Sequence, residues 1–176
     1  MSPVFTHPRD TAGQLEFMPF IESKPGPLGV PGKWDDPRFR AGWSNEPWRD
    51  HPLALTGWRV GVVVRELDPA TDVYTALGAH VTEDERSTAA HRRLLTFGTN
   101  TLVELIAPHS EDTVAGRDLA ANGEIMHACV FETADLAAAE SHLVEHGVGI
   151  AERDGQRLTA DPKTCHGAVI EFVGCA

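Results

Sequence analysis

The strongest constraint on the fold is an internal repeat in the order of the predicted elements. In the first copy, a β-branched strand is followed by a helix and three strand-like segments, and the same order recurs in the second copy. Superposing Leu67 on Leu136 gives an offset of 69 residues and brings Gly78 close to Gly147, each at the end of a predicted helix. The repeat therefore predicts two tandem βαβββ modules.

Local residue preferences place the elements of the first copy. Alternating valines predict a buried strand over 59–64. Asp68, followed by Pro69, predicts a helix start, because Asp is a common N-cap and Pro suits the first turn. Gly78 ends this helix. Three strands are then expected, at 79–82, 92–97 and 101–106, with a hairpin turn over 98–100.

The second copy repeats this pattern after a connector. A strand is predicted over 127–131, and Asp135 is expected to cap a helix that ends at Gly147. Strands follow near 148–151, 157–160 and 168–173.

The stretch 19–54 differs from the rest of the chain. It contains seven prolines and four glycines, which prevent a persistent helix or central strand. It also carries Trp34, Phe39, Trp43 and Trp48, more large apolar side chains than a solvated linker would expose. We expect an extended arm lying on a surface of this chain or of a partner; the alternative is a disordered tail.

The first eighteen residues resemble the end of the second module. His7-Pro8-Arg9-Asp10 and the segment 13–17 are similar to 161–164 and 167–172. Residues 1–18 are therefore expected to form an isolated strand, the end of a module missing from this chain, that adds to a sheet edge of this chain or of a second subunit. Glu16 would then be a further candidate site carboxylate.

Composition excludes several classes of function. The net charge is −11 and the pI is near 5.2, which disfavours binding to nucleic acid or to an anionic membrane surface. No apolar run is long enough to span a membrane, and the N-terminus lacks the features of a signal peptide. Three cysteines without CxxC spacing predict no disulfide framework, so a cytoplasmic location is expected.

Several segments together resemble a known family. The closing strand Val-Glu-Leu-Ile-Ala-Pro (103–108), the glycine-bounded connector at 116–123, Met-His-Ala-Cys-Val-Phe (126–131) and the ending 161–172 resemble methylmalonyl-CoA epimerases of the vicinal oxygen chelate (glyoxalase, bleomycin resistance and extradiol dioxygenase) superfamily. The likeness covers about residues 57–173.

The resemblance implies an α+β fold, in which two tandem βαβββ modules form a curled mixed sheet with helices outside, preceded by the Pro/Trp-rich arm. The modules would occupy 55–110 and 124–176, joined by a connector at 111–123. A homodimer acting on a small-molecule substrate is expected.

The resemblance also implies a site at the mouth of the sheet. In that superfamily, the first and last strands of each module supply the ligands of a divalent metal. Glu104 and Glu171 match the last-strand positions, but the first-strand positions are Arg59 and Ala128. His127 lies one residue away, so it could be a ligand only if a bulge re-aims it.

Two arrangements remain open for the paired carboxylates. A divalent metal could be held by Glu104, Glu171 and His127, or the Arg59 guanidinium could lie between the glutamates and make the site metal-free. His91-Arg92-Arg93 forms a small basic cluster that we interpret as a solvated strand edge or a contact for a substrate phosphate.

Three functional hypotheses follow. The first is an epimerase or isomerase in which Glu171 or Glu104 removes a proton α to a carbonyl, while metal or Arg59 stabilises the enolate. The second is a metal-free binding protein, like the drug-sequestering members of the superfamily. The third, a glyoxalase-type lyase or a dioxygenase, requires the metal.

Overall fold

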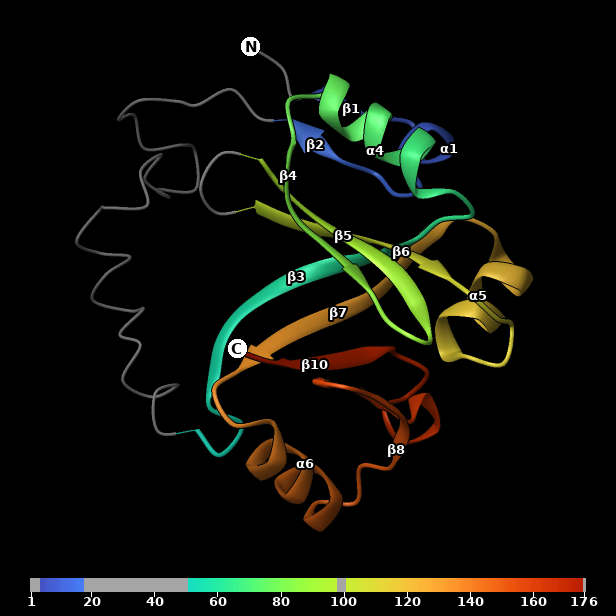
Figure 1. Cartoon of the computed structure of the whole chain (residues 1–176). Coiled ribbons are helices and arrows are strands. Elements are labelled where there is room, and N and C mark those ends of the chain that lie inside the picture. The colour runs from blue at the N-terminus through green and yellow to red at the C-terminus, as the bar shows by residue number, and fades with distance from the viewer. Residues whose placement is uncertain (1–3, 18–50, 98–100, 176) are drawn as a thin grey trace, which may run out of the picture.

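The computed structural model describes residues 4–17, 51–97 and 101–175. The predicted arm at 19–54 falls almost wholly outside these residues, as does the predicted hairpin turn at 98–100. The described chain is dominated by one strongly curved sheet with helices against it (Figure 1).

Each predicted module forms half of this eight-stranded sheet. The first module comprises β3 (Leu55–Val63), α4 (Leu67–Ala76), β4 (His80–Arg86), β5 (Ala90–Phe97) and β6 (Thr101–Pro108). The second comprises β7 (Ile125–Thr133), α6 (Leu136–Glu145), β8 (Ile150–Asp154), β9 (Arg157–Ala160) and β10 (Ile170–Gly174), with a 3₁₀ turn at Pro162–Thr164. The predicted α+β fold with two tandem βαβββ modules is confirmed.

The two modules meet at the centre of the sheet. The strand order is β4-β5-β6-β3-β7-β10-β9-β8, with the first strands of both modules, β3 and β7, paired antiparallel. In each module the first strand also pairs in parallel with the last, β3 with β6 and β7 with β10. The closing strands that carry Glu104 and Glu171 thus flank the central pair.

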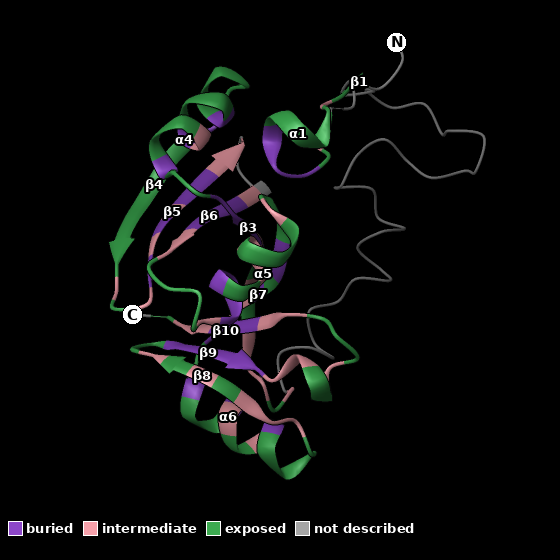
Figure 2. Cartoon of the chain, turned by 90° about the vertical axis from the view of Figure 1, so that its right-hand side faces the viewer, coloured by how far each residue is buried: buried purple, intermediate pink, exposed green. Residues whose placement is uncertain are grey.

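The hydrophobic core lies mainly on the outer face of the sheet. There α4 covers a cluster that includes Val62, Leu95 and Leu105, and α6 covers one built around Leu158 and Phe172. Figure 1 shows these two helices at opposite ends of the curved sheet. Figure 2 shows that β9 is buried along its length, whereas the edge strand β4 is exposed.

The connector contains a helix that the sequence analysis did not predict, α5 (Val114–Asn122). Thr113 caps it by accepting a hydrogen bond from the Gly116 N–H. A Cβ atom on Gly116 would lie 1.9 Å from the Ser110 carbonyl oxygen, so only glycine fits here. Ala115 packs with Val63 in a third core cluster and fixes the helix on the sheet.

The N-terminal residues differ from the prediction. Instead of one strand at a sheet edge, they form a small unit of β1 (Val4–Phe5), α1 (Pro8–Thr11) and β2 (Glu16–Phe17), in which β2 pairs with β1 and not with the large sheet. Glu16 is exposed in this two-stranded sheet. The unit docks on the first module through Tyr74, whose hydroxyl donates to the Thr11 carbonyl oxygen at 2.6 Å.

Within the described ranges, no helix is long and apolar enough to cross a membrane.

Candidate functional site

Two glutamates face the concave side of the sheet from strands of different modules. Glu104 of β6 lies opposite Gly61 of β3, and Glu171 of β10 lies opposite Val130 of β7. Each residue is only 2% exposed. Carboxylates buried this deeply require charge compensation, and the structure supplies it from arginines.

Three buried arginines converge on Glu104. Arg157 of β9 holds both oxygens, with Nη2 donating to Oε1 at 2.6 Å and Nη1 donating to Oε2 at 3.1 Å. Arg92 of β5 donates from Nη1 to Oε2 at 3.0 Å. Arg59 of β3 places Nε 3.3 Å from Oε1. Both oxygens of Glu104 are therefore engaged.

Glu171 is held more loosely. The same Arg92 Nη1 donates to Glu171 Oε2 at 3.0 Å, and Arg157 Nη1 lies 3.7 Å from that oxygen. In the described part of the chain, no hydrogen bond reaches Glu171 Oε1. This oxygen is not one of the fully buried polar atoms, so it retains some accessible surface. One carboxylate oxygen of Glu171 is thus free to receive a proton.

Two less buried carboxylates complete the network. Glu132 of β7 accepts from Arg59 Nη1 at 2.9 Å, and Glu85 of β4 accepts from Arg157 Nη2 at 3.2 Å. Their side chains are 28% and 53% exposed. The Arg157–Glu85 pair joins β9 of one module to β4 of the other, so the network also bridges the two halves of the curved sheet.

The electrostatics keep Glu104 ionised. Burial alone would raise its pKa, but attraction to Arg157, Arg92 and Arg59 outweighs burial and holds the pKa of Glu104 below its usual value. Burial would lower the pKa of Arg157, but the nearby carboxylates of Glu104, Glu171 and Glu85 together outweigh burial and raise it. Glu104 is therefore a fixed anion at neutral pH.

Several arginine nitrogens make no hydrogen bond within the described chain. Within the described residues, the Nε atoms of Arg59, Arg92 and Arg157 are buried without a hydrogen-bond acceptor. The Nη2 atoms of Arg59 and Arg92 also lack an acceptor there. Neither of these two Nη2 atoms is fully buried, so each retains some accessible surface. Two guanidinium donors and Glu171 Oε1 are therefore polar atoms of this cluster that keep some accessible surface and have no partner among the described residues.

A divalent metal does not fit this donor set. The two first-strand ligand positions are Arg59 and Ala128, and three guanidinium groups occupy the surroundings of the two carboxylates. No group of three or more His, Cys, Asp or Glu side chains in the described ranges could hold a metal ion. A cation placed between the glutamates would meet the positive charge already there.

His127 does not join the two glutamates. A bulge interrupts the β3–β7 register between Ala128 and Met126, and it turns His127 toward α5. There Nδ1 lies 2.6 Å from Asp118 Oδ2, and Nε2 is buried without a partner in the described chain. Burial would raise the pKa of Asp118, but the His127 hydrogen bond helps to lower it. The predicted set of Glu104, Glu171 and His127 is thus not formed.

The sequence analysis missed Arg92 and Arg157. The cluster His91-Arg92-Arg93 was expected to be a solvated edge or a contact for a substrate phosphate. Strand alternation separates its members: Arg92 points inward to the two glutamates, while His91 and Arg93 pair outward with Asp84. Two inward glutamates require nearby positive charge, and this requirement combined with alternation could have identified both residues.

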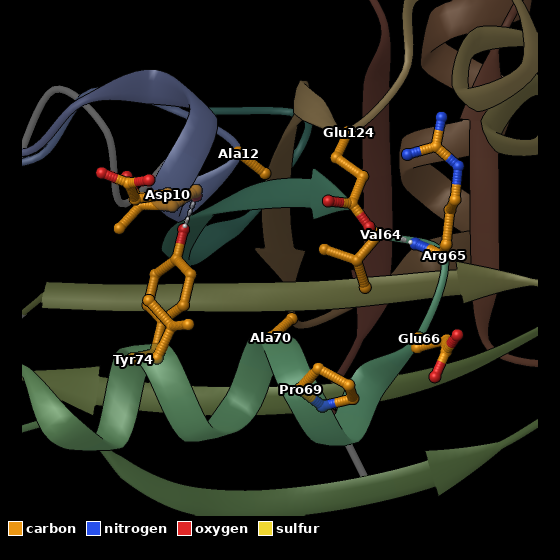
Figure 3. Close-up of a pocket in the computed structure, with 11 residues that line it drawn as sticks. Asp10, Ala12, Val64, Arg65, Glu66, Pro69, Ala70, Tyr74 and Glu124 are labelled. Carbon is orange, nitrogen blue, oxygen red and sulfur yellow. Dashed lines mark hydrogen bonds between the residues drawn. The ribbon is translucent and has the colours of Figure 1, made fainter.

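A separate cavity of about 290 Å³ lies away from these residues, between α1 and α4. Figure 3 shows Tyr74 and Ala70 on α4 facing Asp10 and Ala12 of the N-terminal unit, with Glu124 at one side. Neither the paired glutamates nor the buried arginines line this cavity. The charged cluster on the concave face remains the candidate site.

Comparison with known proteins agrees with the resemblance seen in the sequence. A family model described as a glyoxalase-like domain matches residues 60–172. The structure is similar to that of methylmalonyl-CoA epimerase from Mycobacterium tuberculosis, with 27% identity and a TM-score of 0.61, over 70% of this chain and 90% of that chain. No curated protein is significantly similar in sequence.

Two further structures share the fold. A variant of Streptomyces coelicolor methylmalonyl-CoA epimerase in complex with 2-nitronate-propionyl-CoA is 28% identical, with a TM-score of 0.60, over 69% of this chain and 99% of that chain. A hypothetical protein from Bacillus halodurans is 19% identical, with a TM-score of 0.57, over 67% of this chain and 92% of that chain.

Proposed function

Because the chain belongs to the glyoxalase-like domain family and folds like methylmalonyl-CoA epimerases, we propose that it is a metal-independent isomerase of the vicinal-oxygen-chelate type. Its substrate would be an acyl thioester with an acidic α-proton. The observation that carries the proposal is the unequal state of the two glutamates: Glu104 is fully engaged, whereas Glu171 keeps Oε1 free.

Glu171 is the base in this proposal. A general base needs an accessible lone pair within reach of the substrate proton. Glu171 Oε1 offers one, while Arg92 orients the carboxylate through Oε2. Glu104 cannot serve equally well, because both of its oxygens are occupied and its lowered pKa makes it a poor proton acceptor.

In this proposal, the arginines stabilise the enolate oxygen in place of a metal ion. Proton removal by Glu171 leaves the C–H electrons in a new C=C bond and moves the carbonyl π electrons onto oxygen. An arginine N–H stabilises that oxyanion by a charge-assisted hydrogen bond. The unpaired Nη2 donors of Arg59 and Arg92 are suited to this contact. A proton from solvent water then adds to the opposite face and inverts the α-carbon, and Glu171 releases the proton that it removed to solvent.

Hydrogen exchange at the α-carbon tests this proposal. Methylmalonyl-CoA and related acyl-CoA compounds are incubated with the protein in D₂O, with and without EDTA, and the α-proton signal is followed by NMR. We expect chelator-insensitive exchange that falls at least about 100-fold in Glu171→Gln. Glu83→Gln, on the exposed strand β4, is the matched control and should retain full activity. Exchange that persists in Glu171→Gln would remove Glu171 from the mechanism.

The second candidate is a binding protein of the same fold. The accessible Nη2 donors of Arg59 and Arg92 favour it, since guanidinium donors without an acceptor attract an anionic ligand whether or not a reaction follows. Calorimetry with the same acyl-CoA panel separates the two hypotheses. Tight binding without exchange supports sequestration, whereas neither binding nor exchange contradicts both.

A further inference from the structure

Arg59 is held in the charged cluster by two carboxylates that approach it at different nitrogens. Its Nη1 donates to Glu132 Oε1 at 2.9 Å, and its Nε lies 3.3 Å from Glu104 Oε1. Among the described residues, Glu132 is the only hydrogen-bond acceptor of the Arg59 side chain. Because a guanidinium group is rigid and planar, two contacts at different nitrogens fix its plane, and with it the position of the third nitrogen, Nη2.

Glu132 reaches Arg59 by lying over a strand position that has no side chain. In the β3–β7 ladder, Gly57 is the register partner of Glu132, and a bulge between Leu55 and Gly57 sets this pairing. A Cβ atom on Gly57 would lie 2.5 Å from Glu132 Oε2 and 3.1 Å from Glu132 Cδ. The Glu132 carboxylate therefore occupies the space that a larger residue at position 57 would need.

The contacts of Glu132 are narrower than those of Glu104. Glu104 forms ion pairs with Arg59, Arg92 and Arg157, and its side chain is 2% exposed. Glu132 pairs with Arg59 alone among the described residues, and its side chain is 28% exposed. A change at Glu132 therefore alters the restraint on Arg59 and leaves the other ion pairs of Glu104 in place.

We propose that Glu132 is a positioning residue of the site. Lying over Gly57, it holds the Arg59 guanidinium so that Nη2 keeps the place from which it donates to the enolate oxygen. This inference rests on the proposed function, in which Arg59 stabilises the enolate. Glu132 itself does not touch the substrate. Without its carboxylate, the guanidinium turns about its remaining contact with Glu104, and the oxyanion loses an aligned donor.

Two substitutions remove this restraint by different routes. Glu132→Ala deletes the acceptor. Gly57→Ala keeps the acceptor but displaces it, because the added methyl group meets the end of a flexible side chain rather than backbone atoms. The φ angle of Gly57 lies outside the left-handed region, so alanine can adopt the same backbone conformation. Glu140→Gln is the matched control, because Glu140 pairs with Arg153 at the surface.

Nitrogen-15 NMR of the arginine side chains measures the restraint on Arg59 without any reaction. A guanidinium group held at two nitrogens rotates slowly about its Nε–Cζ bond and gives separate Nη1 and Nη2 signals, which Arg59→Lys identifies by their loss. We expect separate signals in the native protein and in Glu140→Gln, and one averaged signal in Glu132→Ala and in Gly57→Ala. Averaging in the native protein, or separate signals in either of these two variants, would overturn the positioning role.

The α-proton exchange assay in D₂O measures whether this restraint serves catalysis. We expect kcat to fall at least about tenfold in Glu132→Ala and in Gly57→Ala while KM changes less than about twofold, because the lost contact forms with the enolate rather than with the bound substrate. Glu132→Gln keeps an acceptor oxygen for Arg59 and should restore part of the rate. Adding Gly57→Ala to Glu132→Ala should cost no further activity, since no carboxylate remains to be displaced.

The two measurements separate this inference from the proposed function. An unchanged kcat in variants whose Arg59 signals have averaged would overturn the role of Glu132, as would additive losses in the double variant. Absence of exchange in the native protein would overturn the proposed function and the catalytic part of this inference together. The NMR signals decide separately whether Glu132 holds Arg59.

Discussion

Arg157 of the second module donates hydrogen bonds to both carboxylate oxygens of Glu104 of the first module, from Nη2 to Oε1 at 2.6 Å and from Nη1 to Oε2 at 3.1 Å. Each partner is buried, with 5% and 2% exposure. The pair joins β9 to β6, which come from opposite halves of the sheet. It therefore links the integrity of the two-module fold to the geometry of the candidate site.

Removing Arg157 should destabilise the whole sheet. Arg157→Met removes the arginine that binds both oxygens of Glu104. Loss of one member of a buried ion pair lowers the free energy of unfolding by about 3–5 kcal/mol. The measurement is the free energy of unfolding in urea. Arg153→Met is the control, because Arg153 pairs with Glu140 at the surface and its side chain is 48% exposed. Equal losses in the two variants would mean that the buried network is not a structural link.

The folded protein should become less stable as the pH falls, because Glu104 loses its negative charge. The pKa of Glu104 in the folded protein lies below its usual value, so ionisation of this carboxylate favours the folded state at neutral pH. This contribution is lost as the pH falls through the lowered pKa. Urea midpoints measured from neutral to acidic pH should therefore decline in the native protein and decline less steeply in Glu104→Gln. Identical slopes would assign the acid sensitivity to other groups.

The His127–Asp118 pair should respond unequally to removal of either partner. The His127 side chain is fully buried, whereas that of Asp118 is 22% exposed. Asp118→Ala leaves a buried ring with neither nitrogen paired, at a cost of about 1–3 kcal/mol. His127→Leu instead lets Asp118 turn toward water.

We therefore expect Asp118→Ala to be the more destabilising of these two changes in thermal or urea unfolding. Asn122→Ala removes only the exposed partner of Asp118 and should change stability little. If His127→Leu were the more destabilising change, packing of the imidazole rather than its hydrogen bond would contribute most to stability here.

Metal analysis should find far less than one equivalent of divalent ion in protein purified without chelator. Arg59 and Ala128 replace the two first-strand ligands, and His127 is bonded to Asp118. Added Zn²⁺ or Co²⁺ should not raise the melting temperature, because a bound ion would stabilise the folded state by mass action. A stoichiometric ion that is lost in Glu104→Ala would restore the metal hypothesis.

The repeat and the alternation within strands were sufficient to predict most of the architecture. Hydrophobic periodicity along the chain places β3, α4, β7 and α6, because it depends on neighbours in sequence. The same alternation turns Glu104 and Glu171 to one face, and both are buried there. The helix α5 was missed because its polar connector sequence carries only a short apolar face.

The site was predicted less completely than the fold. Arg59 was one of two expected partners of the glutamates and does lie beside Glu104, but Arg92 was expected at a solvated edge or in contact with a substrate phosphate. His127 was allowed as a ligand only through a bulge. The bulge exists, yet it directs the ring to Asp118 of the unpredicted helix α5. Both errors arise because side-chain partners far apart in sequence depend on how the sheet curves.

The sequence by itself determined the two modules and the order of their strands and helices along the chain, because hydrophobic periodicity and helix ends depend on neighbours in sequence. The shared facing of Glu104 and Glu171 was expected from the resemblance of their strands to those of the superfamily. Only the tertiary structure decided what meets those carboxylates. Arg157 lies 53 residues from Glu104 in the chain, and Arg92 lies 79 residues from Glu171. Curvature of one continuous sheet brings these charges within hydrogen-bonding distance, and there guanidinium groups surround the carboxylates that a metal ion would need.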